Sequence, residues 1–225
     1  MAPDDANHDT DALAMDSRPD APLPDGPLSD LTCPQGEACL TFESGPTPGT
    51  VACPDGSYGA AATNTPHGSR ALRIAFNDGA ASYCGSYDLI APTTDIWVRS
   101  WVRPTGSAGY ANIFGVTTAD QTNADVSIFS GGTTLHHGAT QTNDSRDLIP
   151  FNAWTCVELH TQISGTALTM TLYTSGTQRM MAAGSVAAGQ QIVEYSLAWY
   201  ADTALRNYVL WLDNTVVSRT RIPCT

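Results

Sequence analysis

The chain has 225 residues, and its 10 basic and 22 acidic groups give a formal net charge of −12. This balance argues against nucleic acid as a partner, because phosphates are neutralised by clustered cations. No run of about 18 apolar residues is present, so no transmembrane segment is predicted.

The first 30 residues differ in composition from the rest of the chain. They hold eight Asp, five Pro and one Arg, with few large apolar side chains. Such a segment cannot bury enough apolar surface to offset the entropy of ordering it. We therefore predict a disordered Asp/Pro/Ala-rich tether at 1–30 and one folded domain at 31–225.

From residue 31 onward, short segments rich in Thr, Val, Ile, Tyr and Trp alternate with clusters of Gly, Asn, Asp, Ser and Pro. This pattern is typical of β-strands separated by turns, and no segment carries a capped helical stripe. The expected strands are 38–43, 70–77, 96–103, 110–117, 126–129, 155–163, 167–174, 192–200 and 208–218. Strands without helical crossovers predict an all-β, two-sheet antiparallel sandwich of the jelly-roll type.

Alternation along the segment 96–103 places four side chains on one face of its strand: Trp97, Arg99, Trp101 and Arg103. Tryptophan is mostly buried, whereas arginine is rarely buried unless it is paired. The row could therefore point into the core or outward. We favour the outward orientation, because two buried arginines would need acidic partners nearby.

The six cysteines form no CxxC pair and no zinc-like spacing. Their even number predicts three disulfides and hence a secreted or cell-surface protein, with six buried thiols in a cytoplasmic protein as the alternative. Proximity in sequence favours the pair Cys33–Cys39, and adjacency of the terminal strands favours Cys156–Cys224. The remaining pair is then Cys53–Cys84. No apolar signal region follows Met1, so we expect a leader to have been removed.

Three segments carry a resemblance to a known family: Cys39-Leu-Thr-Phe-Glu43-Ser-Gly45, Trp154-Thr-Cys156-Val-Glu158-Leu-His160, and Trp211-Leu-Asp213-Asn-Thr-Val-Val217 before a final Cys224. The pattern resembles the concanavalin A-like lectin/glucanase superfamily, in its laminin-G-like and MAM-like branches found in secreted bacterial proteins. The resemblance covers 38–225. It implies a jelly roll whose concave sheet can hold a glycan, in a superfamily of lectins, glycosidases, lyases and adhesive modules.

Hydrolase chemistry is not expected, and no catalytic residue is assigned. The Glu-x-Asp-x-x-Glu strand of the superfamily's retaining glucanases is absent, and the chain holds only four Glu. A polysaccharide lyase needs a cation or amide against a uronate carboxylate and a His or Tyr base. Arg99, Arg103, Tyr110, Glu158 and His160 could share one sheet face, but the Arg, Gln-x-His and Tyr-Lys motifs of the lyase families are unmatched.

Glycan binding requires fewer specific residues than catalysis does, because sugars stack their C–H faces on aromatic rings while polar neighbours form hydrogen bonds with their hydroxyls. We predict an extracellular non-catalytic glycan-binding or adhesive module whose partner is a polysaccharide or cell-surface glycan. The tail could tether the module to a membrane. A polysaccharide lyase is the alternative, and a structural surface protein without a sugar ligand is the second. The expected ligand-binding residues are Trp97, Arg99, Trp101, Arg103, Tyr110, Glu158 and His160.

Glu43 and Asp213 lie on the first and last expected strands, which are commonly neighbours in jelly rolls. In MAM-like and related jelly rolls, acids at such positions can hold a structural Ca²⁺. The alternative is a pair of surface acids at strand ends.

Two further features receive a structural interpretation. We expect the pair His136-His137 to form a surface hairpin, since neighbouring strand residues point to opposite faces. Trp199-Tyr200 and Trp211 are expected to contribute to packing, because their strands are otherwise apolar.

Overall fold

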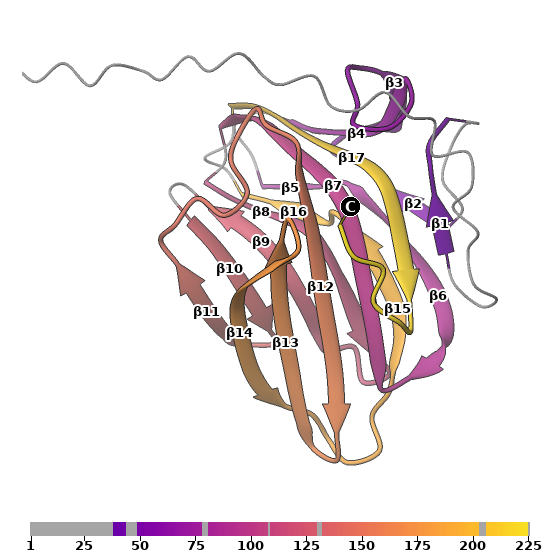
Figure 1. The fold of residues 1–225 in the computed structure, drawn as a ribbon, viewed down its shortest axis with the longest axis vertical. Coiled ribbons are helices and arrows are strands. Elements are labelled where there is room, and N and C mark those ends of the chain that lie inside the picture. The colour runs from indigo at the N-terminus through magenta and orange to yellow at the C-terminus, as the bar shows by residue number, and fades with distance from the viewer. Residues whose placement is uncertain are drawn as a thin grey trace, which may run out of the picture.

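The structure is a computed structural model that describes residues 38–43, 49–77, 81–107, 109–129, 132–202 and 206–224. Within these ranges every regular element is a β-strand, and the strands form two antiparallel sheets (Figure 1). The prediction of an all-β sandwich is confirmed. The expected tether at 1–30 lies outside the described residues. No helix of membrane-spanning length and hydropathy occurs in the ranges given above.

The first sheet, called sheet A here, has eight strands, and β1 (Ala38–Leu40) pairs with β17 beside the main order. Its other strands follow one another as β14 (Thr177–Ser185), β13 (Ala167–Thr174), β12 (Thr155–Ser164), β7 (Asp95–Ser107), β17 (Arg206–Ser218), β4 (Arg70–Phe76) and β3 (Gly56–Ala62).

The second sheet, sheet B, has nine strands, and two short ones lie beside its main order: β16 (Tyr200–Ala201) pairs with β5 (Ser82–Tyr83) and with β8. The other strands follow one another as β11 (Thr140–Asp144), β10 (Gly132–His137), β9 (Asn123–Phe129), β8 (Tyr110–Thr118), β15 (Ile192–Leu197), β6 (Gly85–Thr93) and β2 (Thr50–Ala52).

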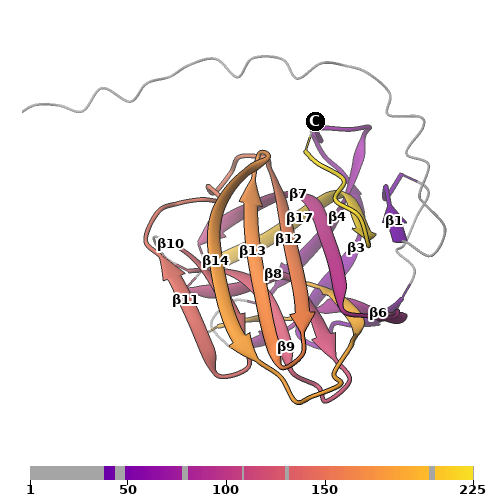
Figure 2. The ribbon, with the colours of Figure 1, turned by 60° about the horizontal axis from the view of Figure 1, so that its bottom comes forward.

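The hydrophobic core lies between the two sheets, which Figure 2 shows as separate layers. Because side chains alternate along a strand, each central strand sends every second residue inward. Val98 on β7 and Leu159 on β12 enter the core from sheet A, and Val116 on β8 enters it from sheet B; all three are buried. Each such side chain contributes about 1.5–3 kcal/mol when fully buried. The same alternation leaves a second, outward row on every strand.

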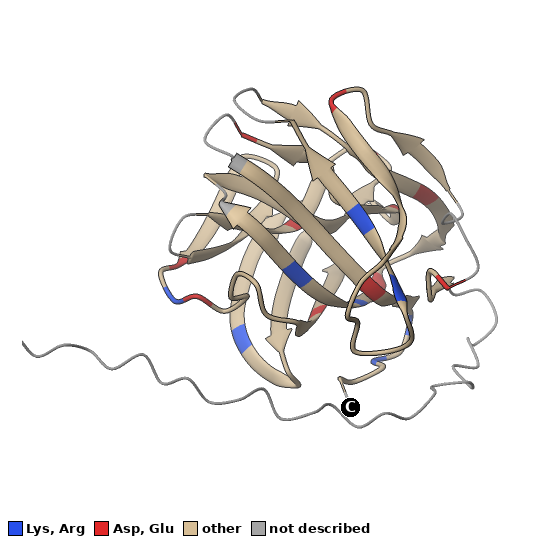
Figure 3. Ribbon diagram, turned by 90° about the horizontal axis from the view of Figure 1, so that it is seen from above, with Lys and Arg blue, Asp and Glu red and all other residues tan. Residues whose placement is uncertain are grey.

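Several strands escaped prediction, among them β6, β10 and β14. They contain Gly, Pro, Asp or Ala in place of a continuous β-branched or aromatic run, so local propensity is weak there. Pairing with neighbouring strands extends them nevertheless. Charged residues are sparse along both sheets (Figure 3), so the few on the outer faces can be considered one by one.

Two of the three expected disulfides are present, Cys53–Cys84 and Cys156–Cys224. The third, Cys33–Cys39, involves Cys33, which lies outside the described residues. The two bridges close loops with sequence separations of 31 and 68. Each is expected to stabilise the fold by about 3–4 kcal/mol, chiefly by restricting the unfolded chain.

Candidate functional site

The predicted indole–guanidinium row lies on the outer face of sheet A. β7 turns Trp97, Arg99, Trp101 and Arg103 away from the core, while Val98 between them is completely buried within it. The favoured outward orientation is therefore confirmed. Being outward does not make the row free, because Arg99 is 6% exposed and the two tryptophans are half-buried.

Strand β12 adds two of the expected site residues to this face, with Glu158 opposite Arg99 and His160 opposite Trp97. The His160 ring stacks on Trp97 with ring centroids 4.0 Å apart and planes 7° from parallel. Its Nε2 lies 2.8 Å from a carboxylate oxygen of Asp95. The expected residues Trp97, Arg99, Glu158 and His160 are therefore brought together, and Asp95, which was not expected, joins them.

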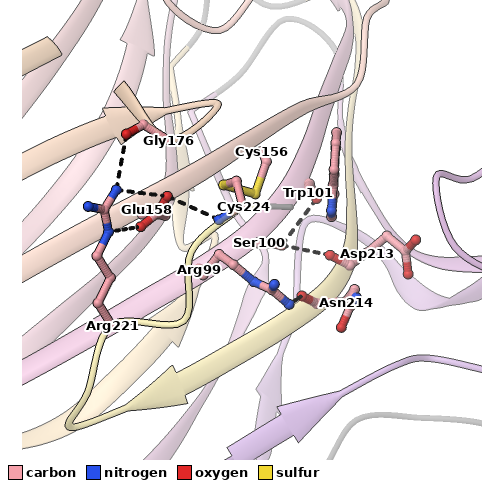
Figure 4. The surroundings of a disulfide bond; sticks show 10 residues. All are labelled: Arg99, Ser100, Trp101, Cys156, Glu158, Gly176, Asp213, Asn214, Arg221 and Cys224. Atoms are coloured by element: carbon pink, nitrogen blue, oxygen red, sulfur yellow. Dashed lines mark hydrogen bonds and ion pairs between the residues drawn. A yellow bond between two sulfur atoms is a disulfide. The ribbon is translucent and has the colours of Figure 1, made fainter. Parts of the chain in front are cut away.

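The C-terminal segment crosses this face and satisfies Glu158 (Figure 4). The Nε of Arg221 donates to Glu158 Oε2 at 2.7 Å, and the backbone N–H of Cys224 donates to Oε1 at 3.3 Å. The disulfide from Cys224 to Cys156 fixes the segment in place. Glu158 is 1% exposed, so its carboxylate is already bound within the protein.

Arginine side chains also cover the aromatic rings of sheet A. The Arg221 guanidinium lies over the rings of Tyr173 and Trp97, at 4.1 and 5.4 Å from their centroids. Arg103 lies 5.2 Å from the ring centroid of Trp154 and 5.4 Å from that of Trp211. Trp211 thus packs, as expected, but on the outer face of the sheet against arginine. These contacts are cation–π interactions, each worth about 0.5–2 kcal/mol.

Tyr110 does not join the other expected site residues. It begins β8, which belongs to sheet B, whereas Arg99, Glu158 and His160 lie on sheet A. The expectation that Tyr110 shares their face is therefore wrong. Pairing between strands far apart in sequence decides which sheet a strand enters, and alternation within one strand carries no information on it.

A cleft with a volume of about 340 Å³ lies on the outer face of sheet B. Strands β6, β8, β9 and β15 form its floor, and Trp199, two residues after β15, also lines it. Most of the lining is polar or aromatic and includes Tyr87, Asn112, Thr117, Asp125, Glu194 and Trp199. Gly115 in the floor allows Asp125 to lie close to β8, because a Cβ there would lie 2.6 Å from the Cβ of Asp125.

Hydrogen bonds hold the polar floor in place. The Nδ2 of Asn112 donates to Asp125 Oδ1 and to Ser127 Oγ, both at 2.7 Å. Across the cleft, Thr117 donates to Glu194 Oε1 at 3.2 Å. Burial raises the pKa of the Asp125 carboxyl, while its hydrogen bond with Ser127, the charge of His136 and its hydrogen bond with Asn112 oppose that shift. The floor is therefore a pre-organised set of carboxylate, amide and hydroxyl groups.

An aromatic chain borders the cleft. Neighbouring rings in it have centroids 5.2 to 6.4 Å apart, and its members in order are Tyr87, Trp199, Tyr83, Tyr200, Tyr110 and His136. Trp199 is 38% exposed and Tyr83 is 48% exposed. Among the described side chains, no arginine lies over a ring of this chain, in contrast to the rings of sheet A.

A local break in the strand positions Trp199. Ala198 has a φ of 49°, a left-handed conformation that ends β15 before the tryptophan. The Trp199 carbonyl then accepts a hydrogen bond from the Cys84 N–H at 3.1 Å. Gly85 allows the close approach, since a Cβ there would lie 2.5 Å from the Ala198 carbonyl oxygen. The expected continuous strand 192–200 is wrong for this reason. Trp199 does pack against Tyr83 and Tyr87, but on the surface and with its side chain exposed.

Tyr110 and His136 meet at the far end of the aromatic chain, with ring centroids 5.4 Å apart. Burial and the nearby Asp125 charge raise the pKa of Tyr110 to about 12. His136 lies opposite Asp125 in the β9–β10 pairing, and its Nε2 is buried without a partner in the described structure. The β10–β11 hairpin expected around His136-His137 is present, and its outward histidine adjoins the cleft.

Glu43 and Asp213, the expected calcium ligands, lie near the loop before β4. Glu43 Oε1 accepts hydrogen bonds from the backbone N–H groups of Ser69 and Arg70 at 2.9 and 3.0 Å. Asp213 is 1% exposed, and its Oδ1 is buried without a partner. Burial, together with the charge of Glu43, raises the pKa of Asp213 to about 7. Among the described residues, no three metal-binding side chains cluster.

The arrangement of the two sheets is the fold of a jelly-roll sandwich of the concanavalin A-like type. "Cellulose induced protein, Cip1" is similar with a TM-score of 0.64 and 17% identity, covering 84% of this chain and 100% of that one. Alginate lyase AlgAT5 from polysaccharide lyase family 7 has a TM-score of 0.51 and 9% identity, covering 72% and 82%. The botulinum neurotoxin serotype G binding domain has a TM-score of 0.52 and 10% identity, covering 83% and 48%.

These identities are low, so the likeness concerns the fold. By sequence, no protein-family profile and no curated protein matches the chain.

Proposed function

We propose that the protein is an extracellular, non-catalytic carbohydrate-binding module and that its glycan lies in the cleft of sheet B. The observation that carries this proposal is the uncovered aromatic chain beside a polar, hydrogen-bonded floor. Rings such as Trp199 offer stacking surfaces to the apolar faces of sugars, while Asn112, Asp125 and Glu194 offer partners to hydroxyl groups.

Two further findings support the partner and the compartment. Among the similar folds, one protein is named as cellulose induced and another as an alginate lyase, which supports a polysaccharide as the ligand. The disulfides Cys53–Cys84 and Cys156–Cys224 support a secreted or cell-surface location, where cystine persists.

A polysaccharide lyase is the second candidate, and the Tyr110–His136 contact is what favours it. A tyrosine and a histidine at one end of a cleft are groups that could move a proton beside a uronate carboxylate. The elimination also requires a cation or amide against that carboxylate. No arginine lines the described cleft, and the Asn112 amide is engaged by Asp125 and Ser127. Binding is therefore the better-supported function.

The test compares one tryptophan from each outer face. Trp199→Ala is expected to weaken binding of a polysaccharide, identified by affinity electrophoresis on a panel of soluble glycans, by about 10- to 100-fold. Trp97→Ala is the matched control, because its ring lies on sheet A under Arg221, and its affinity should stay within about twofold.

The other outcomes separate the alternatives. Equal losses in the two variants, with both folded, would exclude the cleft as the binding site. Any bound polymer is also followed by ultraviolet absorbance, since a new unsaturated uronate would support the lyase. A folded protein that binds no glycan and produces no absorbance supports the purely structural role.

We also propose that Glu43 and Asp213 hold a structural Ca²⁺. The unpartnered buried oxygens of Asp213 and Asn214 support this proposal, because oxygen donors left without hydrogen bonds suit a hard cation. Calcium should raise the melting temperature of the wild type, EGTA should reverse the rise, and Asp213→Asn should lose it. An unchanged melting temperature in calcium would contradict the site.

A further inference from the structure

The cleft of sheet B has an unbalanced charge. Its described lining includes two carboxylates, Asp125 and Glu194, and no arginine. Five arginine–ring contacts, made to four rings on or beside sheet A, show where cations are placed instead, on the opposite side of the sandwich. A ligand entering the cleft therefore meets negative charge beside an aromatic surface.

Asp125 is the carboxylate of the cleft that accepts more hydrogen bonds, and it lacks an arginine partner among the described residues. Its Oδ1 accepts from Asn112 and Ser127, both at 2.7 Å, but no described arginine forms an ion pair with it. Burial raises the pKa of this carboxyl, so its charged form is under-solvated. A carboxylate in this situation gains most from a partner that brings positive charge and N–H donors together.

Glu194 extends the acidic strip along the floor. It lies on β15 opposite Thr117, from which it accepts its hydrogen bond at 3.2 Å. In the pairing of the strands, Ser196 and Gly115 separate it from Asp125. Two acids at different points of one cleft suit a polymer that repeats a cationic group along its length. They also repel a polymer that repeats a carboxylate.

We propose that the ligand of this cleft is an amino-sugar glycan with free, protonated amines, whose ammonium groups are bound by Asp125 and Glu194. The inference rests on the proposed carbohydrate-binding function and deepens it by naming the ligand class. The aromatic chain stacks on the sugar faces, the two carboxylates select the ammonium groups, and uronate polymers are rejected.

The experiment uses the full chain and three oligosaccharides of equal length: a glucosamine oligomer, its fully N-acetylated counterpart and a uronate oligomer. The first two share a backbone and differ in the charge at nitrogen. Affinities are measured by isothermal titration calorimetry at a pH where the amines are protonated. The glucosamine oligomer should bind at least about tenfold more tightly than the N-acetylated one, as expected for charge-assisted hydrogen bonds, and the uronate should bind most weakly.

Isosteric variants test the two carboxylates. Asp125→Asn keeps an oxygen for the Asn112 amide, and Glu194→Gln keeps one for the Thr117 hydroxyl, so both should fold. Each should weaken glucosamine binding by about 3- to 10-fold, and by more than it weakens binding of the N-acetylated oligomer. Asn123→Asp, which adds a charge to the lining, should strengthen glucosamine binding.

The outcomes separate the inference from the proposal beneath it. Equal or tighter binding of the N-acetylated or uronate oligomer by the wild type overturns the amino-sugar inference and leaves carbohydrate binding standing. A preference for glucosamine that survives in both isosteric variants overturns the role of the carboxylates. A folded wild type that binds none of the three oligomers, or any glycan of the wider panel, overturns the proposed function itself.

Discussion

The outer faces of the two sheets both carry aromatic and acidic residues, but these residues have different partners on each face. On sheet A, Arg221 covers Trp97 and pairs with Glu158, so aromatic ring and carboxylate are both satisfied by the chain itself. On sheet B, Trp199 and Asp125 border a cleft that no described arginine enters. A tryptophan beside an acid therefore indicates a ligand site only where the rest of the chain leaves both accessible.

The largest expected effect on this difference comes from a substitution of Arg221 on sheet A. Arg221→Ala removes the guanidinium that is hydrogen-bonded to the buried Glu158 carboxylate, and it should lower the free energy of unfolding by about 3–5 kcal/mol, measured by urea denaturation. The double variant Arg221→Ala with Glu158→Gln removes the charge as well and should recover part of the loss. An identical loss in the single and double variants would show that the ion pair is not what holds this face.

The next largest effect on the free energy of unfolding is expected at Asp213, and it depends on pH. Its pKa of about 7 in the folded protein is above the ordinary value of 3.8, so folding favours the protonated form. Ionisation of Asp213 therefore lowers the free energy of unfolding. The loss is absent below about pH 4, grows as the pH rises towards about 7, and is constant above it. Asp213→Asn should be more stable than the wild type by about 2–4 kcal/mol at about pH 8 without calcium, and equal to it at about pH 4.

Thermal unfolding of both proteins across this pH range, in EGTA, is the measurement. Parallel stability curves for the wild type and Asp213→Asn would contradict the shift of the Asp213 pKa.

A smaller loss of glycan affinity is expected from a substitution in the aromatic chain of sheet B. Tyr83→Ala removes an exposed ring from the aromatic chain outside the cleft lining, and it should weaken glycan binding by about threefold. Leu89→Ala is the matched control, since Leu89 is 73% exposed on neighbouring β6 but takes no part in the ring contacts. Equal affinities of the two variants would limit the binding surface to the cleft itself.

The sequence was sufficient for the fold class because alternation is a local property. The β7 row showed its outward face through Arg99 and Arg103. Strand adjacency predicted Cys156–Cys224, and Cys53–Cys84 was the pair that remained. That Arg221 would cover this row of β7 side chains could not be predicted, because Arg221 and its partner Glu158 are 63 residues apart in the sequence.

The cleft was missed for a related reason. It joins β6, β8, β9 and β15, and β6 was not expected as a strand. Trp199 looked like a packed strand residue, although the left-handed Ala198 turns it outward. Pairing of distant strands and one backbone dihedral together create the site, and neither leaves a pattern in the local sequence.

The attachment of both ends of the described chain to sheet A has a consequence for presentation. β1 pairs with β17, and the disulfide at Cys224 holds the other end against β12. Any continuation from residue 38 or 224 therefore leaves from that side of the sandwich. The proposed ligand, a long polymer, could then lie across the cleft on the opposite sheet without a steric clash with the points where the described chain begins and ends.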